Sequence, residues 1–213
     1  MTLIHRQLVS KLKVALTVND IERIRQALSR PGRPSSDFDL NPETILPAGR
    51  KLRPAGVLAP VMSTPQGLRL VLTKRSSALK HHPGQIAFPG GKQDEGDVDV
   101  TAAALREAHE EIGLQQESVE ILGTLPAHET VTGFMVTPVI GFVHGPFEAR
   151  PEPGEVEEVF SVPLGHVLTA ENYVVEGRHW RGQRRSYFAV PYGPYYIWGA
   201  TARMLRAWTE QMG

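Results

Sequence analysis

The feature that most constrains the fold of this chain is the segment from Arg106 to Leu114, which reads Arg-Glu-Ala-His-Glu-Glu-Ile-Gly-Leu. Together with the residues before it, this segment predicts a helix from about Asp97 to Ile112. Gly113 supplies the left-handed backbone that commonly ends a helix. One stripe of the helix is spaced to face a core, and it consists of Val98, Ala102, Leu105, Ala108 and Ile112.

The acidic residues of this helix are concentrated on its other side. Glu107 and Glu111 are one turn apart, and Glu110 lies next to them, so three carboxylates are expected to converge. Like charges at this spacing destabilise a bare helix, and a divalent cation between them would remove the conflict. Because all the ligands are oxygens, the cation would be Mg²⁺ or Mn²⁺. A solvated acidic face is the alternative interpretation.

A glycine-rich segment upstream favours the metal site over the solvated face. Phe88-Pro89-Gly90-Gly91 predicts a turn leading toward the helix, in which Gly90 and Gly91 allow close approach of the backbone to a metal or a phosphate. Arg106, directly before the first carboxylate, can brace a carboxylate through a bidentate contact.

These residues resemble the Nudix box of the Nudix hydrolases. The match consists of Gly91 followed by Arg106-Glu107-x-x-Glu110-Glu111-x-Gly113-Leu114. Two departures from the usual motif are present: the interval from Gly91 to Arg106 is one residue longer, and Asp97 replaces the first Glu of the box. That Glu is usually peripheral to the metal, so its replacement leaves the implied catalysis intact.

A second segment is similar to the signature of the coenzyme A diphosphatase branch of this family. It comprises Leu72-Thr73-Lys74-Arg75 and then Gly84-Gln85-Ile86-Ala87-Phe88-Pro89-Gly90-Gly91, and residues 72–91 are called the signature segment below. The branch also has the one-residue extension. With further matches downstream, the resemblance extends from about residue 55 to residue 205.

The resemblance implies an enzyme that hydrolyses the diphosphate bond of coenzyme A or its derivatives, releasing 3′,5′-ADP and 4′-phosphopantetheine or its acyl forms. Glu107 and Glu111 would hold Mg²⁺ or Mn²⁺, and Glu110 would be a shared ligand or position the water. We group Glu110 and Arg106 with the catalytic residues. The general base of such enzymes often comes from outside the box, and the candidates are Glu155, Glu157 and Glu158. We favour Glu155, because Pro153-Gly154 before it makes a turn.

Substrate binding is assigned to Lys74, Arg75, Gly90 and Gly91. Lys74 and Arg75 would neutralise the diphosphate or the 3′-phosphate of coenzyme A, although they could instead be solvated charges at a strand end. Two alternatives to the whole function remain. One is a Nudix diphosphatase for another nucleoside diphosphate such as ADP-ribose, and the other is a catalytically inactive module that senses nucleotides.

The remaining sequence predicts three parts and an α/β fold. Residues 1–30 form a helical appendage, residues 31–54 form a linker or strap rich in Pro and Gly, and residues 55–213 form the Nudix domain. Strands are expected at 57–62, 68–73, 119–122, 136–143, 156–162 and 187–191, with a last helix from about Thr201 to Trp208. Strands around a central helix, with another helix at the end, predict a Nudix-type mixed β-sheet sandwiched between α-helices.

Composition excludes several classes of protein. The chain has no cysteine, which rules out disulfides, thiolate metal sites and cysteine nucleophiles. Its 23 basic and 23 acidic residues give a net charge of zero, which argues against a nucleic-acid binder. No apolar segment is long enough to span a membrane, and no signal peptide is visible, so a cytoplasmic location is expected. The resemblance implies a small-molecule substrate of the coenzyme A type as the partner, and homo-oligomerisation is left open.

Overall fold

The computed structural model describes residues 18–47, 49–180 and 183–213. Its main element is a mixed sheet of nine strands with the order β1-β7-β8-β2-β3-β4, in which β5 pairs with β2, β6 with β8 and β9 with β3. The strands are β1 (Ser35–Ser36), β2 (Arg53–Thr64), β3 (Gly67–Arg75), β4 (Ile86–Ala87), β5 (Gly90–Lys92), β6 (Val119–Thr124), β7 (His128–Glu129), β8 (Phe134–Val143) and β9 (Val156–Pro163).

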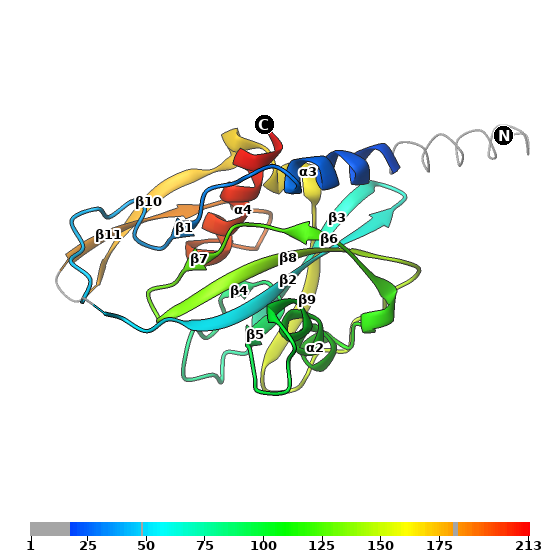
Figure 1. The fold of residues 1–213 in the computed structure, drawn as a ribbon, viewed down its shortest axis with the longest axis horizontal. Coiled ribbons are helices and arrows are strands. Elements are labelled where there is room, and N and C mark those ends of the chain that lie inside the picture. The colour runs from blue at the N-terminus through cyan, green and yellow to red at the C-terminus, as the bar shows by residue number, and fades with distance from the viewer. Residues whose placement is uncertain (1–17, 48, 181–182) are drawn as a thin grey trace, which may run out of the picture.

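Both faces of this sheet are covered by helices, as Figure 1 shows. Strand side chains alternate between the faces. In β2, Leu58 packs under the acidic helix α2 (Val100–Ile112), whereas Ala59 and Val61 join the core on the other face. That second core includes Trp208 of α4 (Gly199–Met212), which is fully buried. The predicted α/β fold, a mixed sheet between helices, is therefore confirmed.

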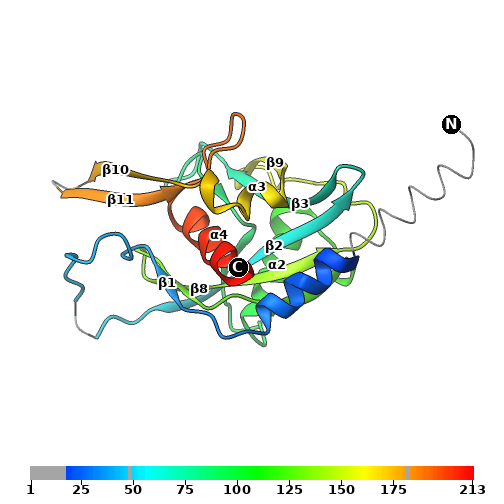
Figure 2. The ribbon, with the colours of Figure 1, turned by 90° about the horizontal axis from the view of Figure 1, so that it is seen from above.

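The described residues before β2 pack against the rest of the protein. In the helix at 18–28, Ile24 and Ala27 are 1% exposed and pack with the α4 side of the core (Figure 2). The following Pro- and Gly-rich stretch contributes β1, which pairs in parallel with β7. Asn41 then exchanges two hydrogen bonds with the backbone of Ser186, at 2.9 and 2.8 Å. Residues 1–17 of the predicted appendage lie outside the described residues.

The acidic helix differs from its predicted form in its start and in its buried face. It begins at Val100, because Asp99 caps it by accepting a hydrogen bond from the Ala102 N–H at 2.8 Å. Val98 therefore precedes the helix and is 90% exposed, so its assignment to the core stripe was wrong. The helical residues that are buried are Ala103, Ala104, Ala108, Glu111 and Ile112.

A two-stranded hairpin extends from the body beside α4 (Figures 1 and 2). It consists of β10 (Val174–Trp180) and β11 (Gln183–Ala189), and only the end of β11 was predicted. Short helical turns, α3 (Leu164–Val167) and η2 (Ala170–Asn172), connect β9 to it, and η1 (Gln116–Ser118) precedes β6. Among the described residues, no helix has the length and hydropathy needed to cross a membrane.

Candidate active site

The glycines before the acidic helix form a strand and not the predicted turn. In β5, Gly90 pairs with Val57 of β2 and Gly91 with Gly56. Gly90 has φ +151°, and a Cβ on it would lie 2.5 Å from the carbonyl oxygen of Gly56, so only glycine fits here. This pairing brings the backbone of Gly90 and Gly91 directly against the acidic helix.

Glu111 is the most buried of the three box carboxylates. It is 5% exposed and accepts a hydrogen bond from the Gly90 N–H at 3.2 Å. Burial raises the pKa of Glu111 to about 7, and the carboxylates of Glu107 and Glu155 act in the same direction. The Gly90 hydrogen bond and the nearby charge of Arg75 lower it only in part. A desolvated carboxylate with like-charged neighbours is the environment that a divalent cation would stabilise.

Glu107 lies one turn earlier and faces the same inner side. Its side chain is 16% exposed, and burial raises its pKa against the opposing effect of Arg106. A Cβ on Gly91 would lie 2.5 Å from the carboxylate carbon of Glu107 and 2.5 Å from its Oε1. Gly91 therefore leaves the space that the Glu107 carboxylate occupies.

Arg106 holds the acidic helix and the preceding loop together. Its Nε and a terminal nitrogen donate to the two carboxylate oxygens of Asp97 at 3.0 and 2.9 Å, which is a bidentate contact. The other terminal nitrogen donates to Glu107 at 2.9 Å and to Glu110 at 3.0 Å. These contacts hold the pKa of Arg106 above its usual range, and the hydrogen bonds to Asp97 contribute most to this effect. Asp97, at the position of the missing box Glu, thus anchors the arginine that orients Glu107.

The expected convergence of all three carboxylates is not found. The Glu110 side chain is 55% exposed and bonded to Arg106, away from Glu111. Within the described ranges, no three acidic, histidine or cysteine side chains are assembled as a ready-made metal site. The donor set nevertheless fits a divalent cation, because the inward carboxylates of Glu107 and Glu111 lie beside the exposed backbone of β5 and supply only oxygen ligands.

The three candidate bases before and within β9 have different environments. Glu157 accepts from Lys74 Nζ at 2.6 Å and from the Ser77 N–H at 3.2 Å. Glu158 accepts from the hydroxyl of Tyr195. Glu155 is exposed and has no side-chain hydrogen bond or ion pair among the described residues, and its charge acts on both Glu107 and Glu111. Glu155 is thus the candidate that is both unengaged and close to the box carboxylates.

The two halves of the signature segment form one structural unit. The Arg75 N–H donates to the Gln85 carbonyl at 2.9 Å, the Gly84 N–H donates to the Arg75 carbonyl at 3.1 Å, and Thr73 pairs with Ala87. A β-bulge against β9 separates Lys74 from Arg75. Lys74 is consequently paired with Glu157, whereas Arg75 lies where its charge reaches Glu111. The structure therefore separates two cations that the sequence suggested would act together.

Two residues that matter to this site were not assigned a role from the sequence. Gly56 lets α2 approach β2, because a Cβ on it would lie 1.9 Å from the Val100 carbonyl oxygen. Tyr195 covers Glu158 and stacks on Phe160 with ring centroids 3.6 Å apart. A glycine within an otherwise apolar strand is the signal for such a close approach, whereas Tyr195 carried no local signal.

Gly91→Ala is expected to lower kcat about 100-fold while the melting temperature changes little. The new methyl group would displace the end of the flexible Glu107 side chain, and a misplacement of about 1 Å can cost that much activity. Gly96→Ala is the matched control, because a Cβ there meets no atom within 4 Å. Turnover with Mg²⁺ and thermal unfolding should be measured for both. Equal activity of the two variants would contradict the role given to Gly91.

Comparison with known proteins identifies the family. The NUDIX domain profile matches residues 52–185. An uncharacterized Nudix hydrolase NudL of Cronobacter sakazakii is 41% identical over 161 residues, covering 76% of this chain and 83% of the relative. The NudL of Klebsiella pneumoniae is 39% identical over 189 residues, which cover 84% of this chain and 98% of the relative.

Two solved structures to which this chain is similar are named as Nudix proteins. The Nudix hydrolase RenU from M. smegmatis has 27% identity and a TM-score of 0.46, covering 55% of this chain and 73% of its own. The NUDIX domain of Shewanella oneidensis NrtR, solved with ADP ribose, has 20% identity and a TM-score of 0.43. The match covers 61% of this chain and 82% of the NrtR chain.

The profile match spans more than half of the chain, and the NudL relatives are about 40% identical over most of their length. Nudix hydrolases are pyrophosphohydrolases that act on small molecules derived from nucleoside diphosphates, and they generally need a divalent metal ion. The predicted enzyme class is thereby confirmed. This chain belongs to the Nudix family and is a Nudix hydrolase.

Proposed function

We propose that this enzyme hydrolyses the diphosphate bond of coenzyme A or its derivatives, giving 3′,5′-ADP and 4′-phosphopantetheine or its acyl forms. The observation that supports this most is the signature segment, whose two halves are hydrogen-bonded into one unit that leads directly into β5. The segment that resembles the coenzyme A branch is thus continuous with Gly90 and Gly91, against which the acidic helix packs.

The box residues have distinct roles in this proposal. Glu107 and Glu111 bind Mg²⁺ or Mn²⁺, and Glu110 at the exposed rim is a shared ligand or positions the attacking water. Arg106 is a positioning residue, because it contacts Glu107, Glu110 and Asp97 at once. When bound between these carboxylates, the ion would lower the pKa of a water molecule and compensate charge on the diphosphate oxygens.

The residues facing the box complete the reaction. Glu155 accepts the proton of the attacking water. Of the three candidate glutamates, Glu157 and Glu158 have side-chain hydrogen bonds, whereas Glu155 has none in the described structure. Arg75 contacts the diphosphate, because its charge already reaches Glu111. Lys74 orders the β9 end through Glu157 and has a smaller part in binding. Phosphoryl transfer requires mainly such positioning and charge compensation.

Coenzyme A is expected to be hydrolysed with a kcat/KM at least about 10-fold above that of ADP-ribose, which corresponds to about 1.4 kcal/mol of differential binding in the transition state. The physical reason is that only coenzyme A presents both a pantetheine arm and a 3′-phosphate to the site. Products should be identified for a panel of coenzyme A, ADP-ribose and diadenosine polyphosphates, with Mg²⁺ and with Mn²⁺. A preference for ADP-ribose with both ions would refute the substrate and leave the Nudix hydrolase assignment intact.

A further inference from the structure

The hairpin β10–β11 has a local excess of positive charge in a protein with none overall. From Val174 to Tyr187 the sequence contains four arginines and a histidine but a single acidic residue, Glu176. A chain of zero net charge cannot attract an anion by its overall field, so an anion must be attracted by local groups of cations.

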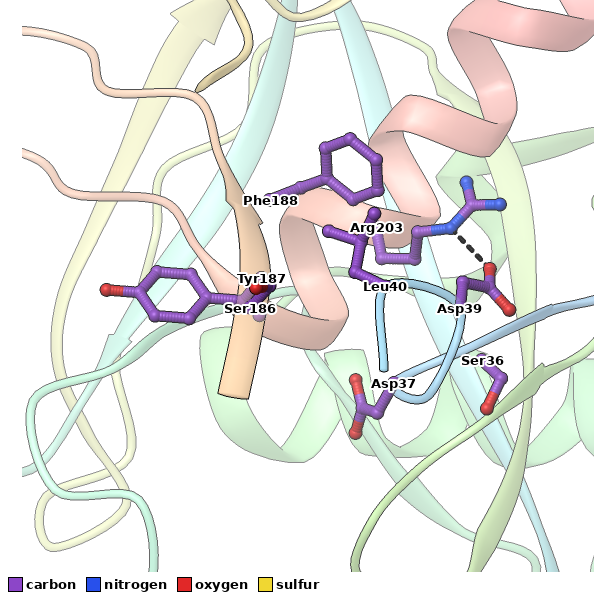
Figure 3. Close-up of a pocket in the computed structure, with 9 residues that line it drawn as sticks. Ser36, Asp37, Asp39, Leu40, Ser186, Tyr187, Phe188 and Arg203 are labelled. Atoms are coloured by element: carbon purple, nitrogen blue, oxygen red, sulfur yellow. Dashed lines mark hydrogen bonds and ion pairs between the residues drawn. The ribbon is translucent and has the colours of Figure 1, made fainter. Parts of the chain in front are cut away.

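One face of the hairpin combines this charge with aromatic rings. Arg178 and Arg185 are directly opposite each other across the two strands, and so are Glu176 and Tyr187. The guanidinium carbon of Arg178 lies 5.4 Å from the ring centroid of Trp198, and the rings of Tyr187 and Trp198 are 5.0 Å apart. Figure 3 shows that the Tyr187 ring points away from Phe188, although both residues line the same pocket. Arg178, Tyr187 and Trp198 are called the aromatic platform below.

The charge of the platform is available to a ligand. Glu176 accepts a hydrogen bond from the Tyr196 hydroxyl at 2.7 Å. Arg178 is exposed and forms no ion pair with a carboxylate among the described residues, and its guanidinium group lies over the Trp198 ring.

The platform is connected to the active site through a short series of contacts. Tyr195 bonds to Glu158, which lies three residues after the proposed base Glu155. Trp198 is three residues beyond Tyr195, a chain length that spans at most about 10 Å. On the other side, the Thr201 hydroxyl donates to the Ile86 carbonyl of the signature segment at 3.0 Å. Trp198 therefore lies in the chain between Tyr195, which contacts Glu158, and Thr201, which contacts the signature segment.

We propose that the aromatic platform binds the nucleoside end of the substrate, with the base stacked on Trp198 beside Tyr187 and a phosphate on the ribose bound by Arg178. This inference rests on the proposed function, in which the substrate is a 3′-phosphorylated adenosine diphosphate derivative. Aromatic stacking and a planar guanidinium suit these two groups, respectively. It also assigns the 3′-phosphate to a cation other than Lys74, which Glu157 engages, and other than Arg75, whose charge reaches Glu111.

The test is equilibrium binding of 3′,5′-ADP and of 5′-AMP, which differ only in the 3′-phosphate and need no turnover. Arg178→Ala should weaken 3′,5′-ADP binding by roughly 10-fold or more, as expected for loss of a charge-assisted contact, and 5′-AMP binding by less than about 3-fold. Trp198→Ala should weaken both nucleotides, and Trp198→Phe should restore most of the affinity. Melting temperatures of all variants show whether they are folded.

Arg184→Ala is the matched control, because Arg184 is an exposed arginine of the same hairpin that extends over Gly177 on the opposite face. It should leave the binding of both nucleotides unchanged within about 2-fold. An equal loss in Arg178→Ala and Arg184→Ala, or an equal loss for both nucleotides in Arg178→Ala, would overturn the platform. Binding of an oligoadenylate more than about 10-fold tighter than 3′,5′-ADP would overturn it in favour of a nucleic-acid site.

Turnover separates the failure of this inference from the failure of the proposed function. If Arg178→Ala lowers kcat/KM for coenzyme A about 10-fold more than for dephospho-coenzyme A, both stand. If coenzyme A is not hydrolysed but 3′,5′-ADP binding depends on Arg178, the proposed function fails and the platform stands. If coenzyme A is hydrolysed and Arg178 has no effect on either assay, the platform fails alone.

Discussion

Replacing Glu111 by glutamine is expected to lower kcat on the order of 10³-fold, which corresponds to about 4 kcal/mol of transition-state stabilisation. Glu111 is the buried carboxylate tied to Gly90, and the amide keeps its size and its hydrogen bond while removing the charge that binds the cation. Glu107→Gln should have a loss of the same order. Turnover should be measured at saturating Mg²⁺ and Mn²⁺, together with Mn²⁺ affinity by calorimetry.

Two control variants show whether the loss of turnover comes from a lost metal ligand. Glu117→Gln changes an exposed carboxylate of η1 and should leave turnover unchanged. Glu110→Gln should have an intermediate effect, because its side chain is 55% exposed at the rim. Near-wild-type turnover in both Glu107→Gln and Glu111→Gln would remove the acidic helix from the catalytic site.

The same Glu111→Gln protein should be more stable than the wild type when no metal is present. The folded-state pKa of Glu111 is raised from 4.5 to about 7, so the native state favours the protonated carboxyl. At low pH the group is protonated in both states and costs nothing. As the pH rises from about 4.5 through about 7, ionisation in the buried site destabilises the native state by roughly 3 kcal/mol.

Thermal unfolding in the presence of a chelator tests this pH dependence. At pH 8 the glutamine variant should melt several degrees above the wild type, and near pH 5 the difference should be small. A variant that melts below the wild type at pH 8 would show that the Glu111 charge stabilises the metal-free fold. Together, lower turnover and higher metal-free stability distinguish a lost ligand from a damaged structure.

Glu155→Gln is expected to lower kcat by about 10²- to 10⁴-fold, the usual contribution of a general base. Glu155 has no hydrogen-bonded partner within the described residues, and its charge acts on both Glu107 and Glu111. The variant should recover part of its rate as the pH is raised, because hydroxide replaces the missing base. The measurement is a pH–rate profile under saturating substrate and metal.

The neighbouring glutamates provide the comparison for this variant. Glu157→Gln should release Lys74 and the Ser77 N–H but leave kcat within about 10-fold, since Glu157 is engaged away from the box. Glu158→Gln should keep a hydrogen bond to Tyr195 and behave similarly. If Glu157→Gln or Glu158→Gln caused the large loss and Glu155→Gln did not, the base would have to be reassigned.

Local sequence patterns were sufficient to predict the framework of this protein. Gly113 ends the acidic helix with φ +71°, and the hairpin of β2 and β3 turns between Thr64 and Gly67, in the gap between the strands expected at 57–62 and 68–73. These features depend on residues a few positions apart, such as a glycine stop or alternating apolar side chains. The same is true of the helical residues Ile21–Leu28.

The face on which the helix packs was decided by its partner strand. Gly56 of β2 leaves room for the Val100 carbonyl, so the alanine side of α2 lies closest to the sheet. Glu107 and Glu111 are turned inward with it, and the pKa of Glu111 rises because it is buried there. The sequence alone determined that positions 107 and 111 share one side of the helix, because residues four apart lie one turn apart whatever surrounds the helix.

Contacts between distant segments were determined only by the tertiary structure. The bulge between β3 and β9 separates Lys74 from Arg75, and the fold brings Tyr195 to Glu158 across 37 residues. The strand β10 was not predicted, because Glu176, Gly177 and Arg178 interrupt any apolar alternation. Pairing and side-chain partners of this kind depend on which strands become neighbours in space, and no local pattern of residues encodes that.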